Sequence, residues 1–184
     1  IYASGYEVYT TVSSELQNHA NKALFRALTE FDRRHGFRAP LHHFSFEQEL
    51  SIEEELGNWM AYLRTLPEFT RALFPVVITA IDNDENCAWG IDKRQEIVTL
   101  PWKRVKWAAR NTKNTSIEKI LNIGDVVYVQ QIGKQRYRLA QLPEVEGALV
   151  SMSPEGAILA LVGGFNYHKS NFNRVIQAKR QPGS

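Results

Sequence analysis

VVITAIDNDENCAWGIDKRQEIVTL, residues 76–100, contains the pattern from which the architecture of the chain can be read. Runs rich in β-branched and other apolar residues alternate here with short polar runs that contain acids, asparagine and lysine. This pattern predicts β-strands connected by turns, because β-branched side chains suit a pleated surface, whereas Asp and Asn suit turns. The strands are expected at Val76–Ile81, Cys87–Ile91 and Gln95–Leu100, with turns at Asp82–Asn86 and Lys93-Arg94.

The same spacing continues towards the C-terminus. Val126–Ile132 and Gln135–Gln141 are expected to form a hairpin around Gly133-Lys134, and a short helix is expected at Ile117–Leu121. Five short strands with a helix between the third and the fourth are typical of the OB-fold, a small Greek-key barrel. The sequence therefore predicts a five-stranded barrel over residues 74–142.

A helix is expected before the barrel, at Ser51–Leu66. Ser51 and Glu54 have the spacing of a capping box, and the acids at 53–55 lie where the helix dipole favours anions. The acids at 47, 49 and 53–55 are therefore interpreted as a solvated helix start, and not as catalytic carboxylates, which need an apolar cleft. The buried face is expected to contain Ile52, Leu56, Trp59, Met60 and Leu63.

The N-terminal region is expected to contain a strand and a long helix. Tyr6–Val12 has the composition of a strand. A helix is expected to follow it, starting with a capping box of Ser14 and Gln17 and ending at about Arg34. Its apolar face is expected to contain Leu16, Ala20, Ala23, Ala27, Leu28 and Phe31.

A second hairpin is expected near the C-terminus. Ala148–Met152 and Ala157–Val162 flank Ser153-Pro154-Glu155-Gly156, which is a favourable turn sequence. The strand Tyr6–Val12 is expected to join this hairpin, so that both ends of the chain form one body with residues 37–143 inserted between them.

The composition is that of an ordinary globular chain. The 184 residues are 43% hydrophobic, with a net charge of +2 and a mean hydropathy of −0.34, which does not indicate a nucleic-acid partner globally. No apolar run approaches the ~18 residues of a membrane span, and no signal peptide is indicated. Cys87 is the only cysteine and is expected to be a core residue. No cofactor or metal is predicted, since His42-His43 has no cysteine or acid at ligand spacing.

Trp102–Arg110 interleaves aromatic and basic residues, as single-stranded nucleic-acid platforms do. We favour the alternative that the tryptophans are core residues beside solvated cations, and a surface for glycan strands or a protein partner is a third possibility. Ser116-Ile117-Glu118-Lys119 is the only literal S-x-x-K of the sequence. It is interpreted as part of the short helix and not as a nucleophile motif.

ALVGGFNYHKSNFNRVIQAKRQPGS, residues 160–184, carries the most specific signal of the chain. Its strand is expected to break at Gly163-Gly164, a pair that costs stability unless the backbone needs it. The aromatic, amide and basic segment that follows contains no acid. Pro182-Gly183 predicts a turn that presents Ser184.

The strings ALVGGF, FNR and QAKRQPGS resemble the start of the transpeptidase domain of class A (bifunctional) penicillin-binding proteins of the Gram-negative type. In that family the serine after such a glycine is the acylated nucleophile and opens an S-x-x-K signature. The resemblance implies that Ser184 is this nucleophile, with its lysine three residues further on. It also implies packing and positioning roles for Asn173 and Arg174.

The resemblance implies an α+β fold, in which an OB-like five-stranded β-barrel is inserted into a strand–helix and β-hairpin segment that borders a transpeptidase domain. The expected divisions are residues 1–36, 37–143 and 144–184. The parent protein would be a peptidoglycan synthase with D,D-transpeptidase and glycosyltransferase activities. It would lie on the periplasmic side of the bacterial inner membrane, held by an anchor upstream of Ile1.

The partners implied by the resemblance are the peptidoglycan stem peptide, β-lactams and an outer-membrane lipoprotein activator that docks on the OB-like domain, without nucleic acid. The 184-residue segment alone is expected to be inactive. The alternative function is an OB-fold module that binds nucleic acid or protein without catalysis.

Overall fold

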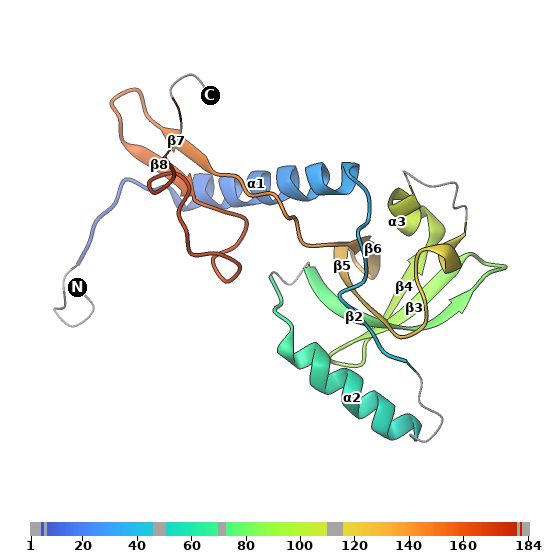
Figure 1. Cartoon of the computed structure of the whole chain (residues 1–184). Coiled ribbons are helices and arrows are strands. Elements are labelled where there is room, and N and C mark those ends of the chain that lie inside the picture. The colour runs from blue at the N-terminus through green and yellow to red at the C-terminus, as the bar shows by residue number, and fades with distance from the viewer. Residues whose placement is uncertain are drawn as a thin grey trace. The chain divides into compact units, whose positions relative to one another are not determined.

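The structure is a computed structural model that describes residues 5, 7–45, 51–69, 73–109, 116–179 and 181. The chain divides into two compact units (Figure 1). The inserted unit is Thr29–Leu142, and the terminal unit combines Ile1–Leu28 with Pro143–Ser184. Helix α1 (Ser14–Arg34) contributes residues to both units.

An antiparallel sheet forms the inserted unit. Its strand order is β1-β5-β2-β3-β4, and β6 pairs with β5 beside β1. The strands are β1 (His42–His43), β2 (Leu73–Asp82), β3 (Cys87–Asp92), β4 (Ile97–Pro101), β5 (Asp125–Gly133) and β6 (Arg136–Ala140). The five longer strands were all predicted from the sequence, and their pairing order is that of an OB-fold opened between β4 and β6.

The predicted closed barrel is not found in the described residues, because β4 and β6 share no ladder there. Two helical segments that the sequence did not predict follow β4 directly, namely α3 (Trp102–Val105) and η1 (Lys106–Ala109). Helix α3 contacts both β4 and β6, and the indole Nε1 of Trp107 donates a hydrogen bond to the carbonyl of Leu139 at 3.0 Å. A side chain therefore occupies a backbone acceptor of β6 that a closing strand could use.

Alternation along β2 and β5 places their side chains in two cores. Val76, Ile78, Val127 and Val129 face the main core, which also contains Ala88, Val98, Leu100, Val105, Ile117, Leu121 and Leu139. Val77 and Val126, each next to one of these residues in sequence, face the other side of the sheet, where they pack against Met60 and Leu63. Burial on both faces explains why these two strands contain continuous apolar runs.

Helix α2 (Ile52–Thr65) covers this second face of the sheet (Figure 1). The predicted capping box is confirmed: the hydroxyl of Ser51 accepts from the N–H of Glu54 at 3.3 Å, and the N–H of Ser51 donates to the Glu54 carboxylate at 2.9 Å. The predicted burial of Ile52 is wrong, since this side chain is 84% exposed. The buried residues of α2, Met60 and Leu63, lie in its second half.

The helix predicted at Ile117–Leu121 is a single 3-10 turn, η2 (Ile117–Lys119). Ile117 and Leu121 are fully buried, so the apolar positions were identified correctly although the regular helix is shorter. Cys87 lies in β3 and is 6% exposed, which agrees with its predicted core position, and burial raises the pKa of its thiol.

In the terminal unit, the predicted C-terminal hairpin is confirmed as β7 (Leu149–Met152) and β8 (Ile158–Val162). The predicted strand Tyr6–Val12 is wrong: residues 7–13 have no strand, and Tyr6 lies outside the described residues. This segment is tied to β8 by the N–H of Ser13, which donates to Leu159, and by the hydroxyl of Thr11, which donates to Ile158. These two hydrogen bonds, one of them from a side chain, do not form a β-ladder.

Helix α1 begins one residue earlier than predicted, with Ser13 as its cap. The hydroxyl of Ser13 accepts from the N–H of Leu16 at 3.4 Å. Gln17 does not close a capping box, because its side chain amide bonds both the carbonyl and the N–H of Leu161 in β8. The buried positions of α1 are Ala20, Leu24, Leu28 and Asp32, whereas the predicted face residues Leu16, Ala23, Ala27 and Phe31 are exposed.

Within the described ranges, no helix combines the length and the apolar character needed to span a membrane.

Candidate functional site

Ser184, the predicted nucleophile, lies outside the described residues, as do Pro182 and Gly183. The structure describes the segment that leads to them, from the end of β8 to Lys179, together with Gln181. This segment belongs to the terminal unit. Its geometry shows how residues 163–179, which precede Ser184 in the sequence, are held.

The segment starts as a closed loop of residues 163–174. The N–H of Arg174 donates to the carbonyl of Gly163 at 3.0 Å and joins the two ends. A Cβ added at Gly163 would lie 2.5 Å from Oδ1 of Asn173 and 2.9 Å from its Cα, and one added at Gly164 would lie 3.0 Å from Arg174 Nη1. Gly163 is therefore needed because the two ends of the loop touch, and not for a left-handed backbone, since it has no positive φ.

The carboxylate of Glu146 lies at the centre of this loop. One oxygen accepts from the N–H of Phe165 at 3.0 Å and lies 3.7 Å from Arg174 Nη1. The other oxygen is 2.9 Å from the ammonium of Lys169. The three side chains are only 17–24% exposed, so these charges interact in a partly desolvated site. A single carboxylate thus holds the start, the middle and the end of the loop.

Its environment keeps Glu146 ionised. Burial by itself would raise the pKa of the carboxyl group, but the hydrogen bonds from Phe165 and Lys169 and the charges of Lys169 and Arg174 bring the pKa below its ordinary value. Lys169 also donates to the carbonyl of Pro143, the first residue of the terminal unit after the inserted unit.

The loop is further fixed by packing and by side-chain bonds at its end. Phe165 is 8% exposed and stacks on Phe25 of α1, with ring centroids 5.1 Å apart. The N–H of Asn173 donates to the Gln177 side chain at 2.6 Å, and the N–H of Gln177 donates back to the carbonyl of Asn173 at 2.8 Å. In contrast, Tyr167 is 75% exposed. The loop backbone is therefore restrained while some of its aromatic surface is open to solvent.

Sequence reasoning missed Glu146. A signal for it exists in the sequence. The segment 163–184 has several cations and no acid, so that half-buried cations in it need a carboxylate from elsewhere in the chain. The position of that carboxylate could not be read from the sequence alone, because it depends on how the hairpin brings residues 146 and 165 together.

In the inserted unit, both tryptophans of the basic and aromatic segment pack against the main core. Lys103 and Lys106 are exposed beside them, and Arg110 lies outside the described residues. Tryptophans that serve as packing side chains cannot at the same time present their full faces to stacked bases.

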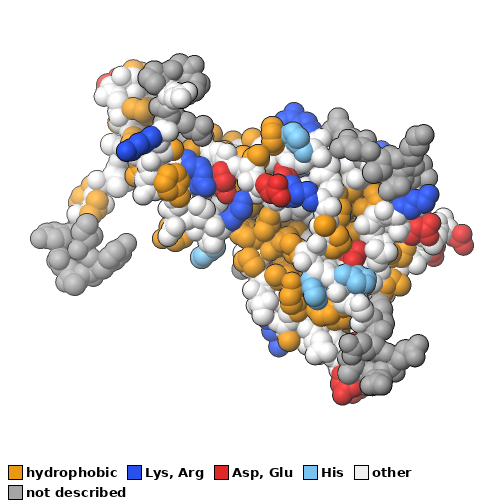
Figure 2. Space-filling model, viewed as in Figure 1, with side chains coloured by type: hydrophobic (Ala, Val, Ile, Leu, Met, Phe, Trp, Pro, Cys, Tyr) orange, Lys and Arg blue, Asp and Glu red, His pale blue; other side chains and the backbone are white. Residues whose placement is uncertain are grey.

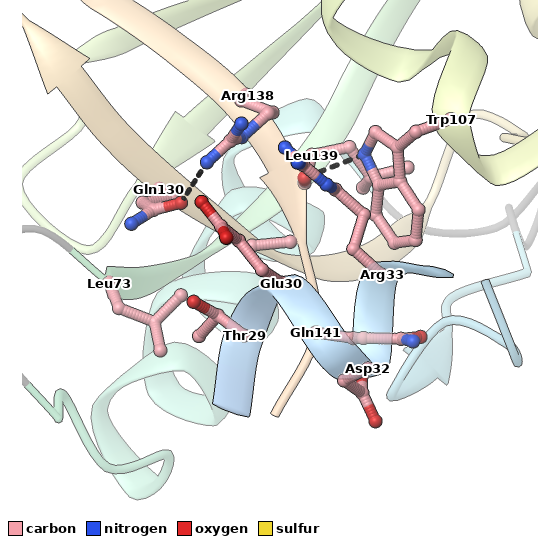
Figure 3. A pocket seen from close by; sticks show the side chains of 11 residues that line it. Thr29, Glu30, Asp32, Arg33, Leu73, Trp107, Gln130, Arg138, Leu139 and Gln141 are labelled. Carbon is pink, nitrogen blue, oxygen red and sulfur yellow. Dashed lines mark hydrogen bonds between the residues drawn. The ribbon is translucent and has the colours of Figure 1, made fainter. Parts of the chain in front are cut away.

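A small pocket of the inserted unit lies between the end of α1 and the strands β5 and β6 (Figure 3). Its cavity volume of about 20 Å³ is enough for roughly one water molecule. Burial lowers the pKa of Arg138 in its wall, the charges of Arg33 and Arg104 lower it further, and Glu30 opposes them. Arg138 donates to the Gln130 side chain at 2.6 Å. A site of this size does not accommodate a substrate.

The other residues considered from the sequence have local structural roles. His43 Nδ1 is 2.8 Å from the carboxylate of the buried Asp125, which also accepts from the N–H of Asn122. No cluster of three or more potential metal ligands occurs among the residues that the structure describes. The hydroxyl of Ser116 donates to Glu118 at 3.3 Å, within the same turn. Glu53 and Glu54 are exposed at the start of α2, and Glu47 and Glu49 lie outside the described residues.

Residues 37–145 match the family of the penicillin-binding protein OB-like domain. The chain belongs to this family. Over its whole length it is also similar to penicillin-binding protein 1A of Pseudomonas aeruginosa (36% identical over 191 residues) and of Escherichia coli K12 (34% over 191 residues). The chain spans 22% of the length of each of these relatives.

A solved structure supports the same assignment. The crystal structure of penicillin-binding protein 1A from Haemophilus influenzae superposes with a TM-score of 0.75 at 31% identity, covering 95% of this chain and 24% of that one. The suspected relationship to class A penicillin-binding proteins is thereby confirmed. The OB-like match lies mainly in the inserted unit, whose surface is drawn in Figure 2 together with that of the terminal unit.

Proposed function

We propose that this chain is the interdomain part of a peptidoglycan synthase of the penicillin-binding protein 1A type and that it leads into a D,D-transpeptidase domain. The observation that carries the proposal is the similarity to such proteins along the entire chain, including the segment that precedes Ser184. Membership in the OB-like domain family alone would support this assignment mainly for the inserted unit.

In the proposed reaction, the hydroxyl of Ser184 attacks the carbonyl of the penultimate D-Ala of a stem peptide. The C–N bond to the terminal D-Ala breaks, and D-Ala leaves with a proton while an ester forms on Ser184. An amine of a neighbouring strand then attacks the ester, which forms the cross-link and returns the proton to the serine. Backbone donors would stabilise the oxyanion, and the lysine three residues after Ser184 would help to activate the hydroxyl. A β-lactam would acylate the same oxygen.

The test is acylation of the parent protein by a fluorescent penicillin, followed by peptide mapping. The expected result is one adduct, on Ser184, which is lost in Ser184→Ala. An adduct on another serine, or no adduct on a folded parent protein, would refute the proposal. The 184-residue chain alone serves as the negative control, since we expect it not to react.

The proposed setting is the periplasmic side of the inner membrane, with an anchor in the parent protein. There the inserted unit would be a docking domain for an outer-membrane lipoprotein activator. The proposal is supported by the match to the OB-like domain family and by the separate core of the inserted unit. Ile97 on β4 (70% exposed) and Ile52 on α2 (84% exposed) are large apolar side chains at which docking can be tested.

Two measurements with the 184-residue chain address this docking function. Binding of a purified activator should weaken in Ile97→Glu or Ile52→Glu and remain unchanged in a variant of the terminal unit such as Glu155→Gln. Binding of single-stranded oligonucleotides at about 50 mM salt, lost on changing Trp102 and Lys106, would favour the nucleic-acid alternative instead.

A further inference from the structure

We propose that Glu146 is a positioning residue for the acylation of Ser184. This inference rests on the function proposed above, since it concerns the same serine. The site assignments implied by the family resemblance named Ser184, Asn173 and Arg174, and all of them lie in the C-terminal segment. Glu146 lies upstream of the β7–β8 hairpin and reaches this segment only through the fold of the terminal unit.

The first step of the argument is that Glu146 restrains the loop at three separate points. Its carboxylate accepts from the backbone of Phe165 and pairs with the side chains of Lys169 and Arg174. Arg174 in turn donates to the carbonyl of Phe172 at 2.9 Å and, through its backbone, to Gly163 at 3.0 Å. Without the carboxylate, the two partly buried cations would lose this ion-pair partner, and the N–H of Phe165 would lose this hydrogen bond.

The second step connects the loop to the serine. The loop ends in a turn that Asn173 and Gln177 close by two reciprocal hydrogen bonds, and Ser184 follows seven residues after Gln177. The loop and this turn thus restrain the described chain that precedes Ser184, up to Gln177. Acylation requires the serine oxygen to be held close to the attacked carbonyl, and a displacement of about 1 Å can cost about a hundredfold in rate.

The third step concerns the charge of Glu146. A glutamine at this position could still accept from the N–H of Phe165, but it could not balance Lys169 and Arg174. An aspartate keeps the charge but is one methylene shorter, so it can balance the cations without reaching all three donors. Comparing these two variants separates the effect of the charge of Glu146 from the effect of its side-chain length.

The experiment measures the acylation of the parent protein by a penicillin, with the noncovalent dissociation constant and the acylation rate constant resolved from the concentration dependence. Each variant is measured well below its own unfolding temperature, so that the folded protein is compared. In Glu146→Gln we expect the acylation rate constant to fall about 10- to 100-fold, whereas the dissociation constant changes by less than about twofold. Glu146→Asp should give an intermediate rate, and Glu155→Gln, at the exposed hairpin turn, the wild-type rate.

A purely structural role would lower the unfolding temperature without lowering the rate constant of the folded protein, and that result would overturn the inference. Equal rate constants for Glu146→Asp and wild type, with Glu146→Gln too unstable to measure, would overturn it as well. If the wild-type protein is not acylated on Ser184 at all, the proposed function fails, and this inference with it. If the wild type is acylated on Ser184 and Glu146→Gln reacts equally fast, only this inference fails.

Discussion

Two regions of the molecule share a combination of aromatic and basic side chains but have opposite structures. Residues 163–174 and residues 102–109 both combine aromatic and basic side chains without an acid. In the first region, the cations Lys169 and Arg174 are withdrawn from solvent onto Glu146, while Tyr167 is exposed. In the second, the aromatic rings pack on a core, while Lys103 and Lys106 face solvent.

The difference lies in what distant parts of the chain offer to each region. The loop meets a carboxylate that comes from the segment before β7, whereas α3 and η1 meet the apolar interior of a sheet and the backbone carbonyl of Leu139. An aromatic and basic pattern therefore does not by itself identify a nucleic-acid surface. It becomes informative only when the partners of its cations are known.

Glu146→Ala should have the largest effect on stability. It removes the ion-pair partner of two largely buried cations, Lys169 and Arg174, together with a hydrogen-bond acceptor of the Phe165 N–H, so we expect a loss of about 3 kcal/mol in the unfolding free energy of the terminal unit. The measurement is thermal and urea unfolding of the 184-residue chain by circular dichroism. Glu155→Gln is the matched control and should stay within about 0.5 kcal/mol of the wild type. Equal stability of Glu146→Ala and the control would contradict the described ion pairs.

Gly163→Ala should have the next largest effect. The added methyl group would lie 2.5 Å from Oδ1 of Asn173 and 2.9 Å from its Cα, so the two ends of the loop would have to separate, at a cost of about 2 kcal/mol. Gly57→Ala is an informative counterpart, since this glycine lies inside helix α2 with open space around it. It should stabilise the inserted unit by roughly 0.5–1 kcal/mol. The same unfolding experiments should give opposite signs for the two variants.

Trp107→Phe tests the second of the two regions, residues 102–109. It removes the hydrogen bond to Leu139 and part of the packing on the main core, and should cost about 1–2 kcal/mol. Lys106→Ala changes an exposed cation in the same 3-10 turn and should be neutral within about 0.5 kcal/mol. Urea unfolding followed by tryptophan fluorescence gives both values. If Lys106→Ala were the more destabilising variant, the assignment of buried rings and free cations would be reversed.

Lowering the pH should have the smallest effect on stability. The pKa of Glu146 is lowered in the folded protein from its ordinary value of 4.5, so its contribution to stability is complete above about this pH and is lost as the pH falls through the folded-state pKa. Glu146→Gln removes this contribution at every pH. The difference in unfolding temperature between wild type and Glu146→Gln should therefore be constant above pH 4.5 and shrink below it. A difference that grows on acidification would show that the pKa is raised instead.

Much of the fold could be predicted because it depends on local pattern. The alternation in residues 76–100 and 126–141 gave the five longer strands of the inserted unit, and Ser51 with Glu54 gave the start of α2. The predictions that were wrong depend on contacts with distant parts of the chain. Tyr6–Val12 has the composition of a strand but no neighbour that forms a ladder with it in the described residues, and Val8 and Tyr9 are exposed instead.

In the candidate site, too, the features that depend on local sequence could be predicted, and those that depend on distant contacts could not. The residues at its C-terminal end could be identified from a specific string of sequence that ends at Ser184, because they are contiguous. Glu146 could not, since its role arises from the return of the chain through β7 and β8 to the position of Phe165. The open edge between β4 and β6 was missed for a related reason: the segment after Pro101 was read as aromatic and basic but not as a helix that packs on β6.

The single cysteine gives the chain a built-in reporter. Cys87 lies in β3 with 6% of its surface exposed, and the sequence contains no second thiol. A thiol reagent can therefore modify the protein only when the inserted unit opens, and the labelling kinetics report the opening equilibrium of that unit alone. A substitution in the terminal unit that leaves the labelling rate unchanged acts locally, whereas one that accelerates it reveals that the opening of the two units is energetically coupled. No cysteine has to be added or removed for this measurement.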